Sequence, residues 1–249
     1  MIQNCVLLDI GNSFTEVAFT HLSSKSPRPF GLKKIQHIPT DSRFNLSCYS
    51  IDSLAIVSSV VPQMNAIVSD YFKHTIFIDH TRIAPFLKMN LERPSQVGAD
   101  RIVNAYAAYQ LYGGPLLIID SGTATTFCYV DASGVYQGGS IFPGIGLSSK
   151  ALNDYTAKIP LIRAKKLTTL YGKTTLSAVQ TGLYWGFVDL INGRIARFKA
   201  DVPGIRVIGT GGALNLLKSE LNLDYFEPHL IFKGLKLLGW EYVNTKKAL

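Results

Sequence analysis

Two short segments of the chain have the residue types that hold phosphate groups and cations. The first is Asp-Ile-Gly-Asn-Ser at residues 9–13, and the second is Asp-Ser-Gly-Thr at residues 120–123. In each, a glycine lets backbone N–H groups approach an anion, and short polar side chains can add hydrogen bonds. The leading aspartate can bind a cation, and magnesium takes one or two carboxylates plus phosphate oxygens and water. One copy alone fits an ordinary hairpin turn, whereas two copies favour a site for a phosphorylated ligand.

A third segment, Gly-Ala-Asp-Arg at residues 98–101, places an acid directly before an arginine. Here Asp100 could act as a general base beside an anion-binding arginine. The same residues also fit the first turn of a helix, where the helix dipole stabilises an acid and Arg101 is solvated. The tetrapeptide alone leaves both interpretations open.

Two glycine-rich segments complete the set. Gly-Thr-Gly-Gly at residues 209–212 follows an apolar run and is typical of a turn that holds a nucleotide against backbone at a helix N-terminus. It is not the dinucleotide-binding fingerprint, whose third glycine would fall at Asn215. Gly-Gly-Ser-Ile-Phe-Pro-Gly at residues 138–144 fits either the lining of a cleft or ordinary turns. The histidines lack zinc-site spacing, so no zinc site is expected.

The elements that must position these segments follow from the hydrophobic pattern. An apolar run before the first turn and an alternating run after it predict two paired strands, and residues 116–127 repeat this arrangement. Apolar residues at Ile102, Ala105, Tyr106 and Tyr109 predict a helix after residues 98–101 that ends at Gly113. The pattern further predicts a loop over 21–34, strands over 54–61, 75–78 and 205–208, and helices over 63–73 and 176–198.

The repeated strand–turn–strand unit recurs after nearly half of the 249 residues. A repeat of that size predicts a duplicated domain rather than a solenoid. The predicted halves are residues 1–110 and 111–249. We expect them to share a packed cleft that contains Asp9, Asp100 and Asp120.

Composition excludes several classes of protein. With 47% hydrophobic and 17% charged residues, the chain is expected to be globular. It has no apolar run long enough for a spanning helix and no basic residue before Asp9, so neither a membrane protein nor a secretory leader is expected. Cys5, Cys48 and Cys128 are odd in number and far apart, which favours reduced thiols in the cytoplasm. The net charge of +8 is scattered, which favours solvated charge first, an anionic ligand second and nucleic acid third.

Taken in order, six segments resemble the type III pantothenate kinases. They are D-I-G-N-S (9–13), G-A-D-R (98–101), D-S-G-T-A-T-T (120–126), G-G-S-I-F-P-G (138–144), G-K-T-T (172–175) and G-T-G-G (209–212). The resemblance spans nearly the whole chain. It implies an α/β fold with two duplicated ribonuclease-H-like (actin-like ATPase) domains flanking a cleft, as in the acetate and sugar kinase/Hsp70/actin superfamily. It also implies ATP-dependent phosphorylation of pantothenate to 4'-phosphopantothenate, the first step of coenzyme A biosynthesis.

The resemblance assigns roles to individual residues. Asp100 is the implied general base, and Gly98, Ala99, Arg101 and Thr175 are the implied contacts to pantothenate. The implied ATP contacts are Asp9, Ile10, Gly11, Asn12, Ser13, Thr123, Gly211 and Gly212. The implied cofactors are Mg²⁺ with ATP, held at Asp9 through phosphate or water, and a monovalent cation, K⁺ or NH4⁺, at Asp120. The family's usual pantothenate-contacting tyrosine is replaced by Leu91.

The resemblance further implies a homodimer, with no nucleic-acid or membrane partner. The helix predicted over 176–198 has a broad apolar face that fits a two-fold interface, although burial within its own domain is the alternative. This face contains Leu183, Phe187, Leu190, Ile191 and Phe198. Two other functions stay open: a phosphatase or sugar kinase of the same superfamily, and a regulatory or nucleic-acid-associated protein that has lost catalysis. The intact Asp9, Asp100 and Asp120 argue against the second.

Overall fold

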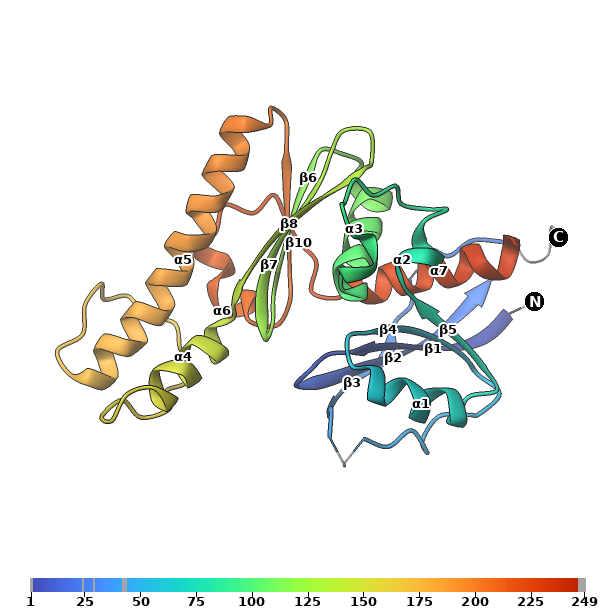
Figure 1. The fold of residues 1–249 in the computed structure, drawn as a ribbon, viewed down its shortest axis with the longest axis horizontal. Helices are drawn as coiled ribbons and strands as arrows, with labels where there is room; N and C mark the ends of the chain where they lie inside the picture. The colour runs from blue at the N-terminus through green and yellow to red at the C-terminus, as the bar shows by residue number, and fades with distance from the viewer. Residues whose placement is uncertain (1, 24, 29, 42–43, 246–249) are drawn as a thin grey trace. The chain divides into compact units, whose positions relative to one another are not determined.

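A computed structural model describes residues 2–23, 25–28, 30–41 and 44–245. The chain forms two compact units (Figure 1). Unit 1 contains the residues up to Tyr112 together with those from His229 onward, and unit 2 is Gly113–Pro228. The chain therefore returns to unit 1 for its last helix, whereas the division expected from the sequence grouped residues 111–249 together.

Unit 1 contains a five-stranded sheet in the order β3-β2-β1-β4-β5. The strands are β1 (Ile2–Ile10), β2 (Phe14–Ser23), β3 (Lys33–Pro39), β4 (Leu54–Ser59) and β5 (His74–Ile78). The first three form an antiparallel meander, and β1, β4 and β5 are parallel. The hairpin predicted around the first Asp-x-Gly turn is therefore confirmed as β1 and β2.

The helices of unit 1 cover both faces of this sheet. On one face, α1 (Pro62–Tyr71) buries Met64 and Val68 in a cluster that includes the alternate β1 residues Val6, Leu8 and Ile10. On the other face lie α3 (Ala99–Tyr112) and α7 (Leu230–Thr245). A Cβ added at Gly239 of α7 would lie 1.9 Å from Ile56 Cδ1 of β4, so the helix backbone rests directly on the sheet. Two short helices, α2 (His80–Ile83) and η1 (Pro94–Gln96), lie between β5 and α3 in the sequence.

Unit 2 repeats the sheet of unit 1. Its strand order is β8-β7-β6-β9-β10, with β6, β7 and β8 antiparallel and β6, β9 and β10 parallel. The strands are β6 (Leu116–Ser121), β7 (Ala124–Val130), β8 (Tyr136–Pro143), β9 (Arg206–Thr210) and β10 (Tyr225–Phe226). Two α/β units with the same strand order confirm the predicted class of duplicated ribonuclease-H-like units.

The long helix of unit 2, α5 (Thr175–Asp201), packs on one face of this sheet. Its side chains Leu183, Phe187 and Ile191 are buried with Leu117 and Ile119 of β6 in one core cluster. The structure thus corrects the prediction that this apolar face forms a dimer interface, because the sheet of its own unit covers it. The remaining helices are α4 (Ile145–Asp154), α6 (Leu214–Leu217) and η2 (Lys218–Glu220). None of the helices in the described ranges is long and apolar enough to cross a membrane.

Some predicted boundaries were wrong. The predicted loop over 21–34 is shorter, because β2 extends to Ser23 and β3 already begins at Lys33. The strand predicted over 205–208 is displaced toward the C-terminus and ends inside the Gly-Thr-Gly-Gly segment, at Thr210. The helix predicted over 176–198 is longer at both ends.

The three cysteines are all free thiols. Cys5 on β1 and Cys128 on β7 are buried, and Cys48 is exposed. Burial raises the pKa of the Cys5 thiol far above its usual range, and the Lys236 ammonium opposes this shift only in part. Cys5 is therefore a protonated core side chain.

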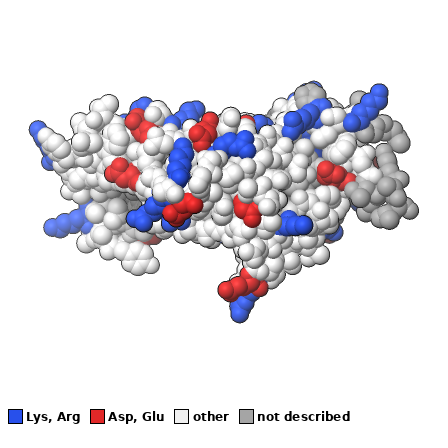
Figure 2. Space-filling view, turned by 90° about the horizontal axis from the view of Figure 1, so that it is seen from above, with Lys and Arg blue, Asp and Glu red and all other residues white. Residues whose placement is uncertain are grey.

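Charged side chains are dispersed on the face shown in Figure 2. Lysine and arginine alternate there with aspartate and glutamate instead of forming a continuous basic stripe. On this face the charge is therefore mixed and solvated, which agrees with the first of the three interpretations of the charge.

Candidate active site

The first Asp-x-Gly turn lies at the end of β1, between β1 and β2. The Gly11 N–H donates to the Phe14 carbonyl at 3.1 Å and closes the turn. Asn12 and Ser13 are exposed, so a ligand can reach this part of the turn. Asp9 is partly buried just before the turn, where β1 runs beside β4. The turn therefore combines a carboxylate, exposed short polar groups and a tightly folded backbone.

Asp100 lies at the start of α3, on the sheet face that also contains Asp9. Alternation along β1 directs Leu8 and Ile10 to the α1 cluster and Asp9 to the opposite face, which α3 and α7 cover. A Cβ added at Gly98 would lie 3.6 Å from Val60 Cγ1, just beyond β4, and 2.4 Å from Asp100 Oδ1. Unit 1 therefore brings residues 98–101 to the strand end where residues 9–13 also lie.

The carboxyl group of Asp100 is held by its own helix start and is poorly solvated. The Arg101 backbone N–H donates to Asp100 Oδ1 at 2.9 Å. Burial raises the pKa of Asp100 above its usual value, while this hydrogen bond and the Arg101 charge lower it by less. The result is a carboxylate of increased basicity next to a cation, which suits proton acceptance.

The raised pKa of Asp100 predicts a change in stability with pH. Folding favours the protonated form of an acid whose pKa is higher in the folded state. Its stabilising contribution is fully present below the unfolded pKa, about 3.9 for aspartate, and is lost as the pH rises through the folded pKa. At neutral pH the buried charge therefore opposes folding. We expect Asp100→Asn to unfold at a higher temperature than the parent protein at pH 7, with the difference shrinking as pH falls toward about 4. Calorimetric unfolding of both proteins across this range checks the prediction, and a difference that grows toward low pH would contradict it.

The second Asp-x-Gly turn, in unit 2, lies against the Gly-Thr-Gly-Gly segment. Asp120 of β6 is the parallel register partner of Thr210 on β9. Gly211 has a φ of 92°, in the region that favours glycine. A Cβ there would lie 2.4 Å from Asp120 Oδ1 and 2.5 Å from the Ser121 carbonyl oxygen. The backbone of this turn therefore lies closely against the Asp120 carboxylate.

The end of β8 also reaches this turn. The Gly144 N–H donates to the Thr123 carbonyl at 2.9 Å. A Cβ at Gly144 would lie 2.3 Å from the Gly122 carbonyl oxygen, so the two backbones are in direct contact. The structure thus brings together three segments of unit 2 that the sequence singled out separately: 120–123, 138–144 and 209–212.

Thr175 is the first residue of α5, and it lines a pocket of about 890 Å³ within unit 2. The helix starts there because the Thr174 side chain accepts a hydrogen bond from the Ser177 N–H in a reciprocal capping box. Leu152, Ile159, Val179 and Leu183 contribute to a largely apolar lining, and Lys173 and Thr174 add polar groups. This combination suits a small ligand that has both an aliphatic part and polar ends.

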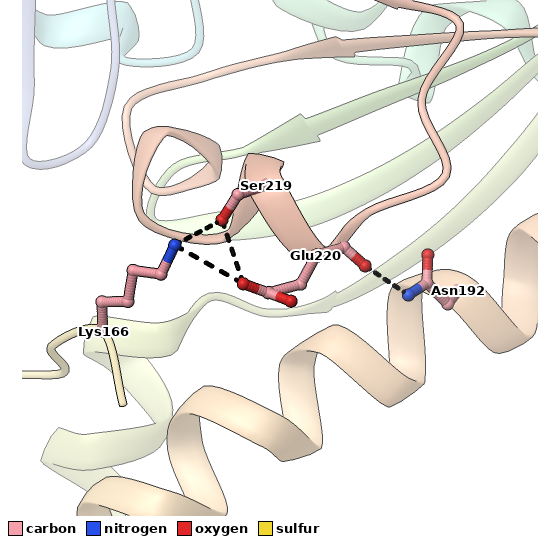
Figure 3. A network of polar contacts seen from close by, with 4 residues as sticks. All are labelled: Lys166, Asn192, Ser219 and Glu220. Atoms are coloured by element: carbon pink, nitrogen blue, oxygen red, sulfur yellow. Dashed lines mark hydrogen bonds and ion pairs between the residues drawn. The ribbon is translucent and has the colours of Figure 1, made fainter. Parts of the chain in front are cut away.

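A polar network holds the segment that leads to this pocket (Figure 3). Lys166 Nζ donates to Ser219 Oγ at 2.8 Å and lies 3.5 Å from Glu220 Oε1. Ser219 Oγ donates to the same carboxylate, and Asn192 of α5 donates to the Glu220 carbonyl at 2.8 Å. The network fastens the connection between α4 and α5 to η2.

The structure separates the predicted site residues by unit. Asp9–Ser13 and Gly98–Arg101 gather in unit 1. Asp120, Thr123, Gly211 and Gly212 gather at one strand end of unit 2, and Thr175 lies in the pocket of the same unit. Ser58, the register partner of Asp9, was not among the residues predicted from the sequence, and Thr210, the register partner of Asp120, was predicted only as part of the Gly-Thr-Gly-Gly segment. The polar pair Ser58-Ser59 at the end of an apolar run was the signal available.

Comparisons with known proteins bear on the family and the fold of the chain. A profile of the family described as "Type III pantothenate kinase" matches residues 5–197. A type III pantothenate kinase from Bacillus cytotoxicus is 43% identical over 189 residues, which is 74% of this chain and 72% of the relative. Among solved structures, a Campylobacter jejuni protein assigned to the Baf family of transcriptional activators has a TM-score of 0.63 at 21% identity, over 96% of this chain and 99% of that one. A Sinorhizobium meliloti protein assigned as a 2-dehydro-3-deoxygalactonokinase has a TM-score of 0.60 at 12% identity, over 95% of each chain. These two likenesses concern the fold alone.

Proposed function

The chain belongs to the type III pantothenate kinase family, and we propose that it transfers the γ-phosphoryl group of ATP to the hydroxyl of pantothenate. The products are 4'-phosphopantothenate and ADP, and the reaction is the first step of coenzyme A biosynthesis. The observation that carries the site assignment is the position of Asp100 at the start of α3, on the face and strand end that also hold Asp9. The three free cysteines fit a reducing cytoplasm.

Asp100 is the residue that we propose as the general base. As the pantothenate oxygen attacks the γ-phosphorus, the bond to the β-phosphate oxygen breaks and the hydroxyl proton passes to the Asp100 carboxylate. Desolvation raises the pKa of this carboxyl group and so increases its affinity for that proton. Arg101, at the same helix start, supplies positive charge for the carboxylate of pantothenate, with Gly98, Ala99 and Thr175 as further contacts. Leu91 offers only apolar contact at the position where the resemblance implies a tyrosine.

The two Asp-x-Gly turns hold the nucleotide in this proposal. Positioning and neutralisation of charge account for most of phosphoryl-transfer catalysis. Backbone N–H groups of the turns and the exposed Asn12, Ser13 and Thr123 bind phosphate oxygens, while Gly211 and Gly212 approach the nucleotide by backbone. The repeated sheet places an aspartate at the same strand end of each unit, which supports a phosphate-binding role for both turns.

The donor set fits a magnesium ion that ATP brings with it. Among the described residues no three His, Cys, Asp or Glu side chains gather into a metal cage. Asp9 is one hard oxygen donor beside a phosphate-binding turn, and magnesium commonly accepts one protein carboxylate plus phosphate and water. When bound, the ion would neutralise phosphate charge. Asp120, held by the backbone of Gly211, is proposed for a monovalent cation, K⁺ or NH4⁺.

Consumption of ATP tests the proposed reaction directly. ADP production should require pantothenate and Mg²⁺ together and should rise when K⁺ or NH4⁺ is added. Mass spectrometry should identify a phosphorylated pantothenate. ADP release with sugars but not with pantothenate would instead indicate a sugar kinase of the same superfamily. Salt-dependent DNA binding without turnover would indicate the regulatory alternative.

We also propose a homodimer, formed by a different surface from the α5 face considered first. Large apolar side chains are exposed along residues 155–176 of unit 2: Tyr155, Leu161, Leu170, Tyr171 and Leu176. Tyr155 is 89% exposed and Leu170 is 74% exposed, which is unusual for such side chains gathered in one short stretch. Burial of this segment against a second copy would remove them from water. The segment includes part of the Thr175 pocket, so dimer formation would also shape that pocket.

A charged substitution tests the dimer. Leu170→Asp should reduce the mass measured by light scattering at micromolar concentration from two chains to one, because a buried unpaired carboxylate opposes association. Ile67→Asp, at an exposed apolar position on α1 of unit 1, is the matched control and should leave the mass unchanged. A parent protein that is monomeric at this concentration contradicts the proposal.

A further inference from the structure

Ser58, the fifth residue of β4, has a fully buried side chain. Within the described part of the chain, no hydrogen-bond partner lies within reach of its hydroxyl oxygen. A buried hydroxyl without a partner lowers stability, and alanine would fit the same strand without this penalty. Native proteins satisfy nearly all such groups, so Ser58 requires an explanation.

Ser58 lies beside Asp9, the carboxylate that is proposed to bind Mg·ATP. Ser58 is the parallel register partner of Asp9, and in-register side chains on neighbouring strands lie on the same face. Ala55 and Val57 pack into the α1 cluster, so Ser58 lies on the opposite face, covered by α3 and α7. Ser58 thus shares with Asp9 the face and the strand end where Gly98 and Asp100 lie.

The other register neighbour of Asp9 cannot serve as its donor. Glu16 on β2 is a carboxylate, and it pairs with His37 of β3 at 3.0 Å between Oε1 and Nδ1. A second negative charge would repel Asp9, whereas a hydroxyl can donate to it. Of the two in-register neighbours, only Ser58 can orient the Asp9 carboxylate by a hydrogen bond.

The duplication provides an independent parallel. Asp9 and Ser58 in unit 1 occupy the same sheet positions as Asp120 and Thr210 in unit 2, on the central strand and its parallel neighbour. Thr210 is also buried, with 4% of its surface exposed. Each unit therefore places a buried hydroxyl residue next to the aspartate of its turn.

We propose that Ser58 is a positioning residue for Asp9. In the enzyme loaded with Mg·ATP, the Ser58 hydroxyl donates a hydrogen bond to the Asp9 carboxylate and fixes its orientation toward the metal and phosphates. Groups that orient a metal-binding carboxylate in this way typically change metal affinity by about 10- to 100-fold. The inference rests on the proposed function in one respect, namely that Asp9 takes part in binding Mg·ATP.

Three substitutions separate the hydroxyl from the packing. Ser58→Ala removes the hydroxyl. Threonine and valine have nearly the same shape, so the comparison of Ser58→Thr with Ser58→Val isolates the effect of the hydroxyl. Calorimetric titration with Mg·ATP, and the Mg²⁺ concentration at half-maximal velocity, are the measurements. We expect the alanine and valine variants to bind Mg·ATP roughly 10-fold more weakly, the low end of the usual range, and the threonine variant to stay near the parent value. The KM for pantothenate should not change.

The neighbouring serine is the matched control. The hydroxyl of Ser59 accepts from the Val61 N–H at 3.2 Å and donates to the Val61 carbonyl at 3.3 Å. Ser59→Ala should therefore lose stability but keep the parent affinity for Mg·ATP, while Ser58→Ala should not lose stability. This opposite pattern in thermal unfolding distinguishes positioning from a structural role.

Several results would overturn the proposal. The first is that Ser58→Ala binds Mg·ATP as tightly as the parent protein. The second is that this variant loses stability and loses all activity uniformly, and the third is that the parent protein does not bind Mg·ATP. The titration contains no pantothenate. Weakened binding in Ser58→Ala, together with failure of pantothenate as a substrate, would refute the assigned reaction and leave the role of Ser58 supported.

Discussion

Asp100→Asn is expected to lower kcat by about 10²–10⁴, the usual effect of removing a general base. Asparagine has nearly the same size and can still accept the Arg101 N–H, so the start of α3 should be preserved. It cannot take the proton from the pantothenate hydroxyl. Because the proposed nucleotide contacts lie on the two Asp-x-Gly turns, the affinity for Mg·ATP should change little. Steady-state kinetics and Mg·ATP titration of the variant measure the two effects separately.

The companion variant Asp9→Asn should behave differently. It weakens the contact to metal and phosphate, so its Mg·ATP affinity should fall together with its turnover. If Asp100→Asn kept more than roughly a tenth of the parent turnover, well above the range for a lost base, Asp100 would be only a helix-start residue. The interpretation of Gly-Ala-Asp-Arg as an ordinary first turn of a helix would then be correct.

Gly211→Ala is expected to have the second large effect. Its φ of 92° is unfavourable for alanine, and the new Cβ would lie 2.4 Å from Asp120 Oδ1 with backbone atoms at similar distances. The Asp120 carboxylate must then move. A displacement of about 1 Å in a catalytic constellation can lower the rate by about 100-fold. We expect a loss of turnover of that order, together with weaker activation by K⁺ or NH4⁺.

Backbone strain alone can be measured at another glycine of unit 2. Gly204 has a φ of 75°, but a Cβ there would meet no atom of the described residues within 4 Å. Gly204→Ala should therefore lower the unfolding temperature through strain, which is of order 1–3 kcal/mol for such a conformation, and leave turnover unchanged. Equal losses of turnover in both variants would show that strain, and not displacement of Asp120, explains Gly211→Ala.

The fold was predictable from the sequence where local pattern and motif agree. The apolar run before each Asp-x-Gly turn is a strand because it is buried on both faces, and the alternating run after the turn pairs back with it. β3 was missed because Lys33, Gln36 and His37 mask its alternation, which suits an edge strand exposed to water. β8 was missed because Gly138 and Gly139 resemble a turn. The structure instead needs Gly139 there, since a Cβ would lie 1.9 Å from the Phe127 carbonyl oxygen of the paired strand.

The candidate site was predictable as a set of motifs and not as a set of contacts. Gly211 and Asp120 are far apart in sequence, and only the parallel pairing of β6 with β9 brings them together. The raised pKa of Asp100 depends on burial by distant segments, which a tetrapeptide does not encode. The apolar face of α5 fitted a dimer interface and a domain core equally well, and the sheet of unit 2 covers it.

The return of the chain to unit 1 for α7 has a consequence for synthesis on the ribosome. Unit 2 is an insertion, complete once Pro228 has been made, whereas unit 1 still lacks the helix whose Gly239 lies against Ile56 of its sheet. Until α7 emerges from the ribosome, it cannot cover the apolar face of β1 and β4 on which it packs. The middle of the chain can therefore fold during translation, while the unit that begins at the N-terminus finishes last, against the usual N-to-C order of domain folding.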